Sequence, residues 1–131
     1  MKRALILLAI CATCHAAPPD SFWRALHIVE TSGRTGKILG DYVNGKPQAL
    51  GPLQIHRSYH QDSRVAGDYS RVADLAYSKR VATAYLKRYA PEAWAAGDVE
   101  TLARVHNGGP RGHLKPATKS YGVRVKALSK K

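Results

Sequence analysis

Apolar residues recur at helical spacing over most of this chain, and this periodicity restricts the fold more than any other feature. Phe22, Leu26 and Val29 fall where one face of a helix can bury them. The longest run with the same pattern, from Ser70 to Tyr89, is expected to form the central core helix. The predicted helices extend from Asp20 or Ser21 to Gly33, from Gly51-Pro52 toward Tyr59, from Ser70 to Tyr89, from Asp98 to Asn107 and from Ala117 to Leu128.

A small hairpin is expected between the first two helices. Asn44-Gly45 is a strong hairpin signal, because both residues adopt the left-handed conformation that a two-residue turn requires. Pro47 has no backbone N–H, which argues against a long second strand. We therefore predict an α+β fold that is mostly α, with a helical core and one small β-hairpin.

The first residues have the pattern of a cleavable signal peptide. Lys2-Arg3 precedes an apolar run from Ala4 to Ala12, and small residues follow around Ala16 and Ala17. The run is shorter than the roughly 20 apolar residues that a spanning helix needs. We expect residues 1–17 to be removed, residues 18–131 to form a single domain, and the protein to be secreted or periplasmic without a stable membrane span.

Cysteine usage and charge restrict how the mature protein is stabilised and what it binds. Both cysteines, Cys11 and Cys14, lie in the predicted signal peptide, so packing alone must hold the domain together. The chain has 21 Lys and Arg residues against 9 Asp and Glu residues, a formal net charge of +12. For an exported protein this charge favours a polyanionic partner, such as an anionic cell-wall polymer, an anionic membrane or extracellular nucleic acid. A charged, solvated surface explains it equally well.

Two carboxylates flank the predicted hairpin. Glu30 falls in the last turn of the first helix, at the edge of its buried face, and Asp41 follows Gly40 in the hairpin. Glycosidic bond cleavage needs such a pair, because one acid donates a proton while the other meets positive charge on the sugar ring. Taken alone, Glu30 fits better a surface carboxylate paired with Arg24 or Arg34, and Asp41 fits an ordinary turn.

Five motifs that occur in order along the chain favour the interpretation of Glu30 and Asp41 as a catalytic pair. They are Glu30-Thr31-Ser32, Gly51-Pro52-Leu53-Gln54-Ile55, Tyr85-Leu86-Lys87-Arg88-Tyr89, Ala103-Arg104-Val105-His106-Asn107-Gly108-Gly109-Pro110 and Ala117-Thr118-Lys119-Ser120-Tyr121. Together they resemble the invertebrate-type (destabilase-like) lysozymes, over nearly all of the predicted mature chain. More distantly, they resemble lytic transglycosylases and goose-type lysozymes. The resemblance implies a lysozyme-like fold with the hairpin beside an active-site cleft.

The resemblance also implies roles for particular residues. Glu30 matches the family's catalytic acid and Asp41 its second carboxylate, with Asp62 as the alternative second acid. The positions expected to orient Glu30 or to bind the glycan are Gln54, His106, Asn107, Gly108 and Tyr121. A core aromatic is the competing interpretation of Tyr121. Gly108 and Gly109 would end a helix with positive dihedrals and leave room for a bulky chain.

Other constellations are weaker. His56 and His60 stand four residues apart and could share a helix face, with Asp62 nearby, but no further ligand set appears. His113 and Ser120 could be proposed as base and nucleophile, but nothing in their spacing supports it. We predict no metal and no cofactor.

The sequence therefore predicts a lysozyme, a muramidase that hydrolyses the β-1,4 bond between N-acetylmuramic acid and N-acetylglucosamine in peptidoglycan. It is expected to be a monomer whose partners are glycan strands and anionic wall polymers, without specific nucleic acid. One alternative is a lytic transglycosylase that uses Glu30 alone. Another is a non-catalytic cationic protein that binds the bacterial envelope.

Overall fold

The computed structural model describes residues 17–131. Within this range the chain forms six α-helices, three short 3-10 helices and a three-stranded antiparallel sheet. The elements in order are α1 (Asp20–Thr31), β1 (Leu39–Val43), β2 (Lys46–Leu50), β3 (Ile55–His56), α2 (Arg57–Ser63), η1 (Tyr69–Ala73), α3 (Leu75–Tyr89), α4 (Pro91–Ala96), α5 (Val99–Gly108), η2 (Gly112–Leu114), η3 (Pro116–Thr118) and α6 (Lys119–Ser129). The predicted α+β, mostly α fold is confirmed.

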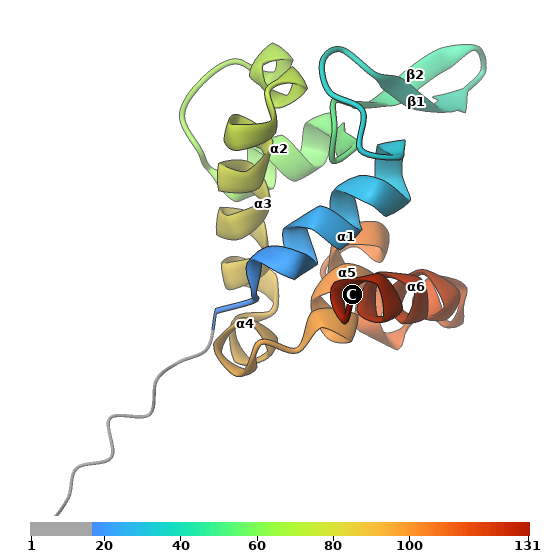
Figure 1. The fold of residues 1–131 in the computed structure, drawn as a ribbon. Helices are drawn as coiled ribbons and strands as arrows, with labels where there is room; N and C mark the ends of the chain where they lie inside the picture. The colour runs from blue at the N-terminus through green and yellow to red at the C-terminus, as the bar shows by residue number, and fades with distance from the viewer. Residues whose placement is uncertain (1–16) are drawn as a thin grey trace, which may run out of the picture.

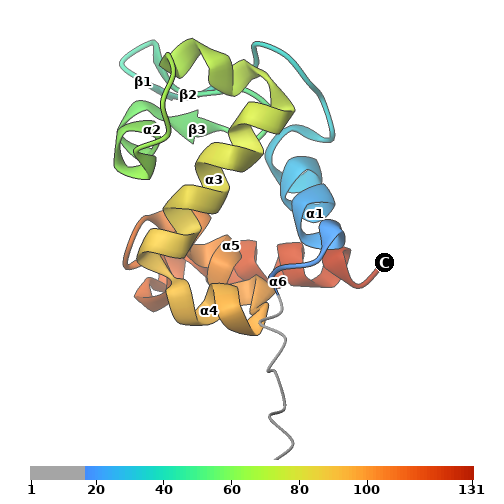
Figure 2. The same ribbon diagram turned by 90° about the vertical axis from the view of Figure 1, so that its left-hand side faces the viewer.

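The molecule has two ends joined by α1 and α3 (Figures 1 and 2). The sheet and α2 form one end, and α4, α5 and α6 form the other. The long helix α3 crosses from the first end to the second, as the sequence predicted for its central core helix. Helix α1 packs on α6 and carries its last turn toward the sheet.

Helix α1 has the predicted extent but a different N-cap. Asp20 is the first helical residue, and Pro19 stands at the N-cap without a side-chain hydrogen bond, so the expected capping by Asp20 or Ser21 is wrong. At the other end Ser32 adopts the left-handed conformation (φ 56°) and its N–H bonds to the carbonyl of Ile28, with Gly33 following at φ 75°. Glu30 therefore lies in the last turn, partly buried, as expected.

The sheet is larger than the predicted hairpin. Strands β1 and β2 meet at the Asn44-Gly45 turn, and Pro47 is accommodated in β2 opposite Tyr42. The helix expected from Gly51-Pro52 toward Tyr59 is wrong. Residues 51–54 form turns, β3 pairs with the end of β2, and α2 begins only at Arg57. Gln54 adopts φ 50°, which ends any helix begun at Pro52.

The helix predicted from Ser70 divides in two. Residues 69–73 are 3-10, and α3 begins at Leu75, where the carboxylate of Asp74 accepts the N–H of Tyr77 as an N-cap. Helix α4, which begins at Pro91, was not predicted. Asp98 caps α5 through the N–H of Thr101, as predicted.

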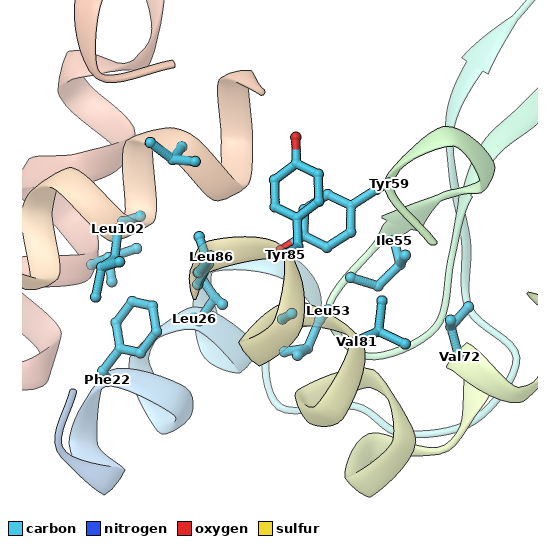
Figure 3. Close-up of a cluster of buried hydrophobic side chains, with 14 of the residues drawn as sticks. Phe22, Leu26, Leu53, Ile55, Tyr59, Val72, Val81, Tyr85, Leu86 and Leu102 are labelled. Atoms are coloured by element: carbon cyan, nitrogen blue, oxygen red, sulfur yellow. The ribbon is translucent and has the colours of Figure 1, made fainter. Parts of the chain in front are cut away.

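One core joins the two ends. Phe22 and Leu26 of α1 pack with Leu86 of α3 and Leu102 of α5, and all four are fully buried (Figure 3). The same cluster continues toward the sheet. Its members there are Leu53, Ile55, Tyr59, Val72, Val81 and Tyr85. Because one packed core extends through both ends of the molecule, it fixes the positions of the side chains that lie between the two ends.

The predicted signal peptide, residues 1–17, lies outside the described residues apart from Ala17. Between Ala17 and Lys131, no helix has the length and apolar character needed to cross a bilayer.

Candidate active site

A pocket of about 290 Å³ opens between the two ends of the molecule. Residues of the sheet end and of α5 line it from opposite sides, and Glu30 contributes from the end of α1. The lining residues are Glu30, Asp41, Gln54, His56, Ser58, Tyr59, Asp62, Tyr85, His106, Asn107, Gly109 and Pro110. The pocket thus brings together both predicted carboxylates and three of the five predicted binding residues.

Glu30 is enclosed by aromatic and imidazole groups. Its side chain is 16% exposed, and the Tyr121 hydroxyl donates a hydrogen bond to its Oε1 from α6. His106 Nε2 lies 3.6 Å from the same oxygen. Neither Arg24 nor Arg34 forms a salt bridge with it among residues 17–131, so the surface ion pair considered from the sequence is wrong.

Burial is the main influence on the acidity of Glu30. It raises the pKa from 4.5 to about 7; the hydrogen bond from Tyr121 opposes this change, and the charge of Asp41 adds to it. Burial also raises the pKa of Tyr121 well above its usual range, so its hydroxyl stays a donor. At neutral pH a large share of Glu30 therefore retains its proton, which is what a general acid requires.

His106 is a buried, neutral neighbour of Glu30. Its Nδ1 accepts a hydrogen bond from Tyr59 Oη at 2.8 Å, and its Nε2–H donates to the carbonyl oxygen of Leu53 at 3.1 Å. Because a carbonyl oxygen only accepts, these partners define the tautomer. Burial lowers the pKa of His106 to about 4 against the opposing effect of the Leu53 carbonyl. At neutral pH the contact with Glu30 is therefore not an ion pair.

Asp41 has the opposite surroundings. Its side chain is 63% exposed, and Oδ2 lies 2.7 Å from Nε2 of His56 on β3. The residue adopts φ 50°, and the pairing of β1 with β2 skips it, since Gly40 and Tyr42 have partners and Asp41 has none. Aspartate tolerates this left-handed conformation better than most residues do. Asp41 lines the pocket from this irregular position of β1.

Gln54 supports the base of the hairpin. Its Nε2 donates to the carbonyl oxygens of Ile38 at 3.1 Å and Gly51 at 2.9 Å. A Cβ at Gly40 would overlap Oε1 of Gln54, so a side chain at position 40 would displace the Gln54 amide from this arrangement. Gln54 lines the pocket, but its amide nitrogen is already engaged by backbone groups. Its predicted role in binding the glycan stays a prediction.

The end of α5 forms the opposite wall. Asn107 is exposed and lines the pocket, as do Gly109 and Pro110. Gly109 has φ 89°, as predicted, but Gly108 is helical and its Cα faces Thr118, whose Cγ2 leaves no room for a side chain. Gly108 is absent from the lining, so the structure places it behind the wall. Close packing accounts for this glycine.

Sequence reasoning missed four lining residues, His56, Ser58, Tyr59 and Tyr85. Tyr59 and Tyr85 stack with ring centroids 3.6 Å apart, and the Tyr59 hydroxyl orients His106. Tyr59 had been placed only at the end of an expected helix, and Tyr85 only in the central helix and in one of the five motifs, without a role at the site. His56 had been considered as a metal ligand, although its position directly after the Gln54-Ile55 motif could have indicated the pocket. Asp62, the alternative second acid, also lines the pocket, from α2.

The structure does not bring together the other two residue groups considered from the sequence, the metal ligands around His56 and His60 and the pair His113 and Ser120. His56 lies on β3, whereas His60 is buried in α2 with its Nε2 2.8 Å from the Tyr77 hydroxyl, so the two do not share a helix face. No group of three potential metal ligands exists among residues 17–131. Ser120 and His113 form no hydrogen bond with each other within that part of the chain.

The body is mainly helical with a small sheet, and one pocket is lined by a partly buried carboxyl, Glu30, and an exposed one, Asp41, which fits a glycosidase with the lysozyme-like fold. Curated lysozymes of bivalves share its sequence. The identity is 31% with a lysozyme of Ostrea edulis, over 94% of this chain and 89% of the relative. It is 30% with a lysozyme of Magallana gigas, over 95% of this chain and 93% of the relative. No protein-family model matches the chain.

Solved structures agree with this comparison. The lysozyme of Meretrix lusoria, crystallised in complex with Aeromonas hydrophila PliI, superposes with a TM-score of 0.68 and 26% identity. The alignment covers 86% of this chain and 91% of the Meretrix chain. The chain belongs to the invertebrate-type lysozymes.

Proposed function

We propose that this lysozyme hydrolyses the β-1,4 bond between N-acetylmuramic acid and N-acetylglucosamine in peptidoglycan, with Glu30 as general acid and Asp41 as second carboxylate. The observation that carries the proposal is the contrast between the two acids that line one pocket. Burial raises the pKa of Glu30 to about 7, whereas the side chain of Asp41 is 63% exposed. A pair with different surroundings can hold one proton and one negative charge at the same pH.

In this proposal Glu30 protonates the leaving oxygen while Asp41 stabilises the positive charge that develops on the sugar ring. Tyr121 and His106 orient Glu30. The Tyr121 hydroxyl donates to one carboxyl oxygen, and neutral His106 approaches the same oxygen without adding a charge. His56 holds Oδ2 of Asp41 and leaves Oδ1 without a protein hydrogen bond among residues 17–131. Asn107 contacts the glycan from the α5 wall.

The bivalve relatives are named lysozymes, which supports the substrate class. We extend the proposal to location: residues 1–17 are removed on export, and the remaining chain acts as a single domain on the bacterial wall. Its positive charge draws it toward anionic wall polymers, so its activity on whole wall is expected to fall as the salt concentration rises.

The second candidate is a lytic transglycosylase, favoured by one observation. The Tyr121 hydroxyl donates to Glu30, and the distant resemblance to lytic transglycosylases and goose-type lysozymes implies a tyrosine that bonds the catalytic glutamate in this way. Such an enzyme cleaves the same bond without water and leaves an anhydro sugar, using the glutamate alone.

Product mass separates these functions. Purified protein is incubated with peptidoglycan, and the soluble fragments are weighed by mass spectrometry. Hydrolysis gives reducing ends, whereas transglycosylation gives fragments lighter by one water. A protein that releases no fragment, but still binds or kills bacteria through its charge, would instead be a non-catalytic envelope-binding protein.

A further inference from the structure

A second concave surface lies away from the candidate active site. We call it the α1–α3 groove, a depression of about 410 Å³ whose lining includes Trp23 of α1, Val65 after α2, and Lys79, Arg80, Thr83 and Lys87 of α3. It shares no lining residue with the candidate active site. Trp23 precedes Glu30 by two helical turns, a rise of about 10 Å.

The groove and the active site use opposite faces of α3. Tyr85 lines the active site, while Thr83 and Lys87 line the groove. Each helical residue advances about 100°, so residues two positions before and after Tyr85 point about 160° away from it, on the other side of the helix. A ligand in the groove therefore leaves the active site open.

The groove combines aromatic surface with positive charge. Both tryptophans of the chain are here: Trp23 lines the groove, and Trp94 of α4 packs on Trp23 with ring centroids 6.3 Å apart. Lys87 Nζ lies 5.4 Å from the ring centre of Trp94. Trp94 does not line the groove itself, so it supports Trp23 from α4, which follows the end of α3 (Figure 1).

The cations of the groove have no anionic partner in the protein. None of the nine acidic residues lines it, and within residues 17–131 Lys79, Arg80 and Lys87 form no salt bridge. Lys79 and Lys87 are eight positions apart, which separates them by about 12 Å along α3. One small anion cannot span that distance, whereas a chain with repeated anionic groups can.

We propose that the α1–α3 groove binds a phosphodiester-linked polyol polymer carrying sugar substituents, of the kind found in bacterial walls. The phosphates pair with Lys79, Arg80 and Lys87, and a sugar ring packs its C–H face on Trp23.

A membrane surface fits less well, because Trp23 and Val65 are recessed and partly buried, whereas apolar side chains exposed at the surface, such as Tyr42, lie elsewhere. Binding there would hold the protein on the wall while the active site, across α3, remains free.

The test measures binding of soluble poly(glycerol phosphate), which contains no glycosidic bond and so cannot be cleaved by a glycosidase. Wild-type protein is titrated at 0.15 M salt while tryptophan fluorescence is followed, since both tryptophans report on the groove. We expect saturable binding that Lys79→Gln/Lys87→Gln weakens about tenfold. The control Lys119→Gln/Lys130→Gln removes the same charge from the first residue and the C-cap of α6, and is expected to stay within about twofold of wild type.

Two additions separate the ligand classes. A glucosylated form of the polymer should bind more tightly than the bare form, and Trp23→Leu, which keeps an apolar residue there, should abolish that preference while thermal unfolding confirms the fold. Single-stranded oligonucleotide and phosphatidylglycerol vesicles are titrated in parallel. We expect the groove variant and the α6 control to affect their binding equally.

Four results would overturn the proposal. They are no saturable binding at 0.15 M salt, equal weakening by the groove and α6 variants, displacement of the polymer by chito-oligosaccharide bound in the active site, and a loss of vesicle or oligonucleotide binding specific to the groove variant. Each is independent of turnover. Failure here would leave the proposed hydrolysis untouched, and failure of the hydrolysis would leave this binding untouched.

Discussion

Glu30 and Asp41 carry the same functional group at two differently built sides of one pocket. Glu30 stands on α1, which packs on α6, and its side chain is 16% exposed between Tyr121 of α6 and His106 of α5. Asp41 stands on a hairpin that projects from the body and is 63% exposed (Figure 1). The packed side supplies desolvation, which raises a carboxyl pKa, while the projecting side leaves its carboxylate in water.

The comparison extends to the partner of each acid. Glu30 has a neutral histidine and a tyrosine hydroxyl, both held by the core, whereas Asp41 has the partly exposed His56. The surroundings therefore favour the protonated form of Glu30 and the charged form of Asp41. The predictions that follow test this division, first at Glu30 and then at Asp41 and Tyr121.

Glu30→Gln should produce the largest loss of activity. Glutamine preserves the shape and can accept the Tyr121 hydrogen bond, but it cannot donate a proton to the leaving oxygen. We expect turnover of peptidoglycan to fall by about 10³-fold or more. Thermal unfolding provides the control for folding. Turnover within tenfold of wild type would remove Glu30 from the mechanism.

The same variant should change how stability depends on pH. Since the pKa of Glu30 is raised from 4.5 to about 7, the native state binds more protons than the unfolded state in this range, and stability falls as pH rises through it. The pKa of His106 is lowered from 6.5 to about 4, so its contribution rises with pH between those values. The two contributions, each about 3 kcal/mol, largely offset in wild type.

Glu30→Gln removes the falling contribution and leaves the rising one of His106. Relative to wild type, the variant is expected to gain about 3 kcal/mol of stability between pH 4 and pH 8. Urea unfolding at both pH values measures the gain. His106→Gln should show the reverse, with stability that declines from pH 4.5 toward 7.5. An equal difference between wild type and Glu30→Gln at both pH values would contradict the assignment of a buried, protonated Glu30.

Asp41→Asn should reduce turnover by at least about tenfold, because it removes the negative charge that meets the developing positive charge. Asparagine also adopts φ 50° readily, so the change isolates charge from backbone conformation. Asp62→Asn is the matched control, since it neutralises another carboxylate of the same pocket. We expect Asp62→Asn to stay within about threefold of wild type. A larger loss at Asp62 than at Asp41 would exchange their roles.

The packed and projecting sides also differ in how far sequence predicts them. Helices α1, α3 and α5 follow from apolar spacing, and the start of α5 follows from Asp98, whose cap acts within three residues. The equally local cap of α3 at Asp74 was missed, so that helix was expected to begin at Ser70. Strand β3 has only two residues, and it forms because Ala49 and Leu50 offer partners across the chain. No local pattern distinguishes it from the helix that was expected there.

The candidate site shows the same limit. Tyr121 meets Glu30 across 91 positions, and His106 meets Tyr59 and Leu53 across 47 and 53. Spacing along the chain cannot reveal such contacts, so Tyr121 and His106 were predicted only through resemblance to a family. Tyr59 and Tyr85 belong to none of the roles transferred from that family and were missed. Their stacking depends on how α2 meets α3, which is a property of the packed core.

Tyr121→Phe should have the smallest effect and the most specific one. The hydrogen bond from Tyr121 lowers the pKa of Glu30, so its loss should raise that pKa above about 7. The alkaline limb of kcat/KM against pH is then expected to move to higher pH, with less than about tenfold loss at neutral pH. Tyr85→Phe removes a pocket hydroxyl that does not bond to Glu30, and its limb should not move. A limb that stays in place for Tyr121→Phe, or moves to lower pH, would show that the packed side of the pocket does not set the proton affinity of Glu30 through this tyrosine.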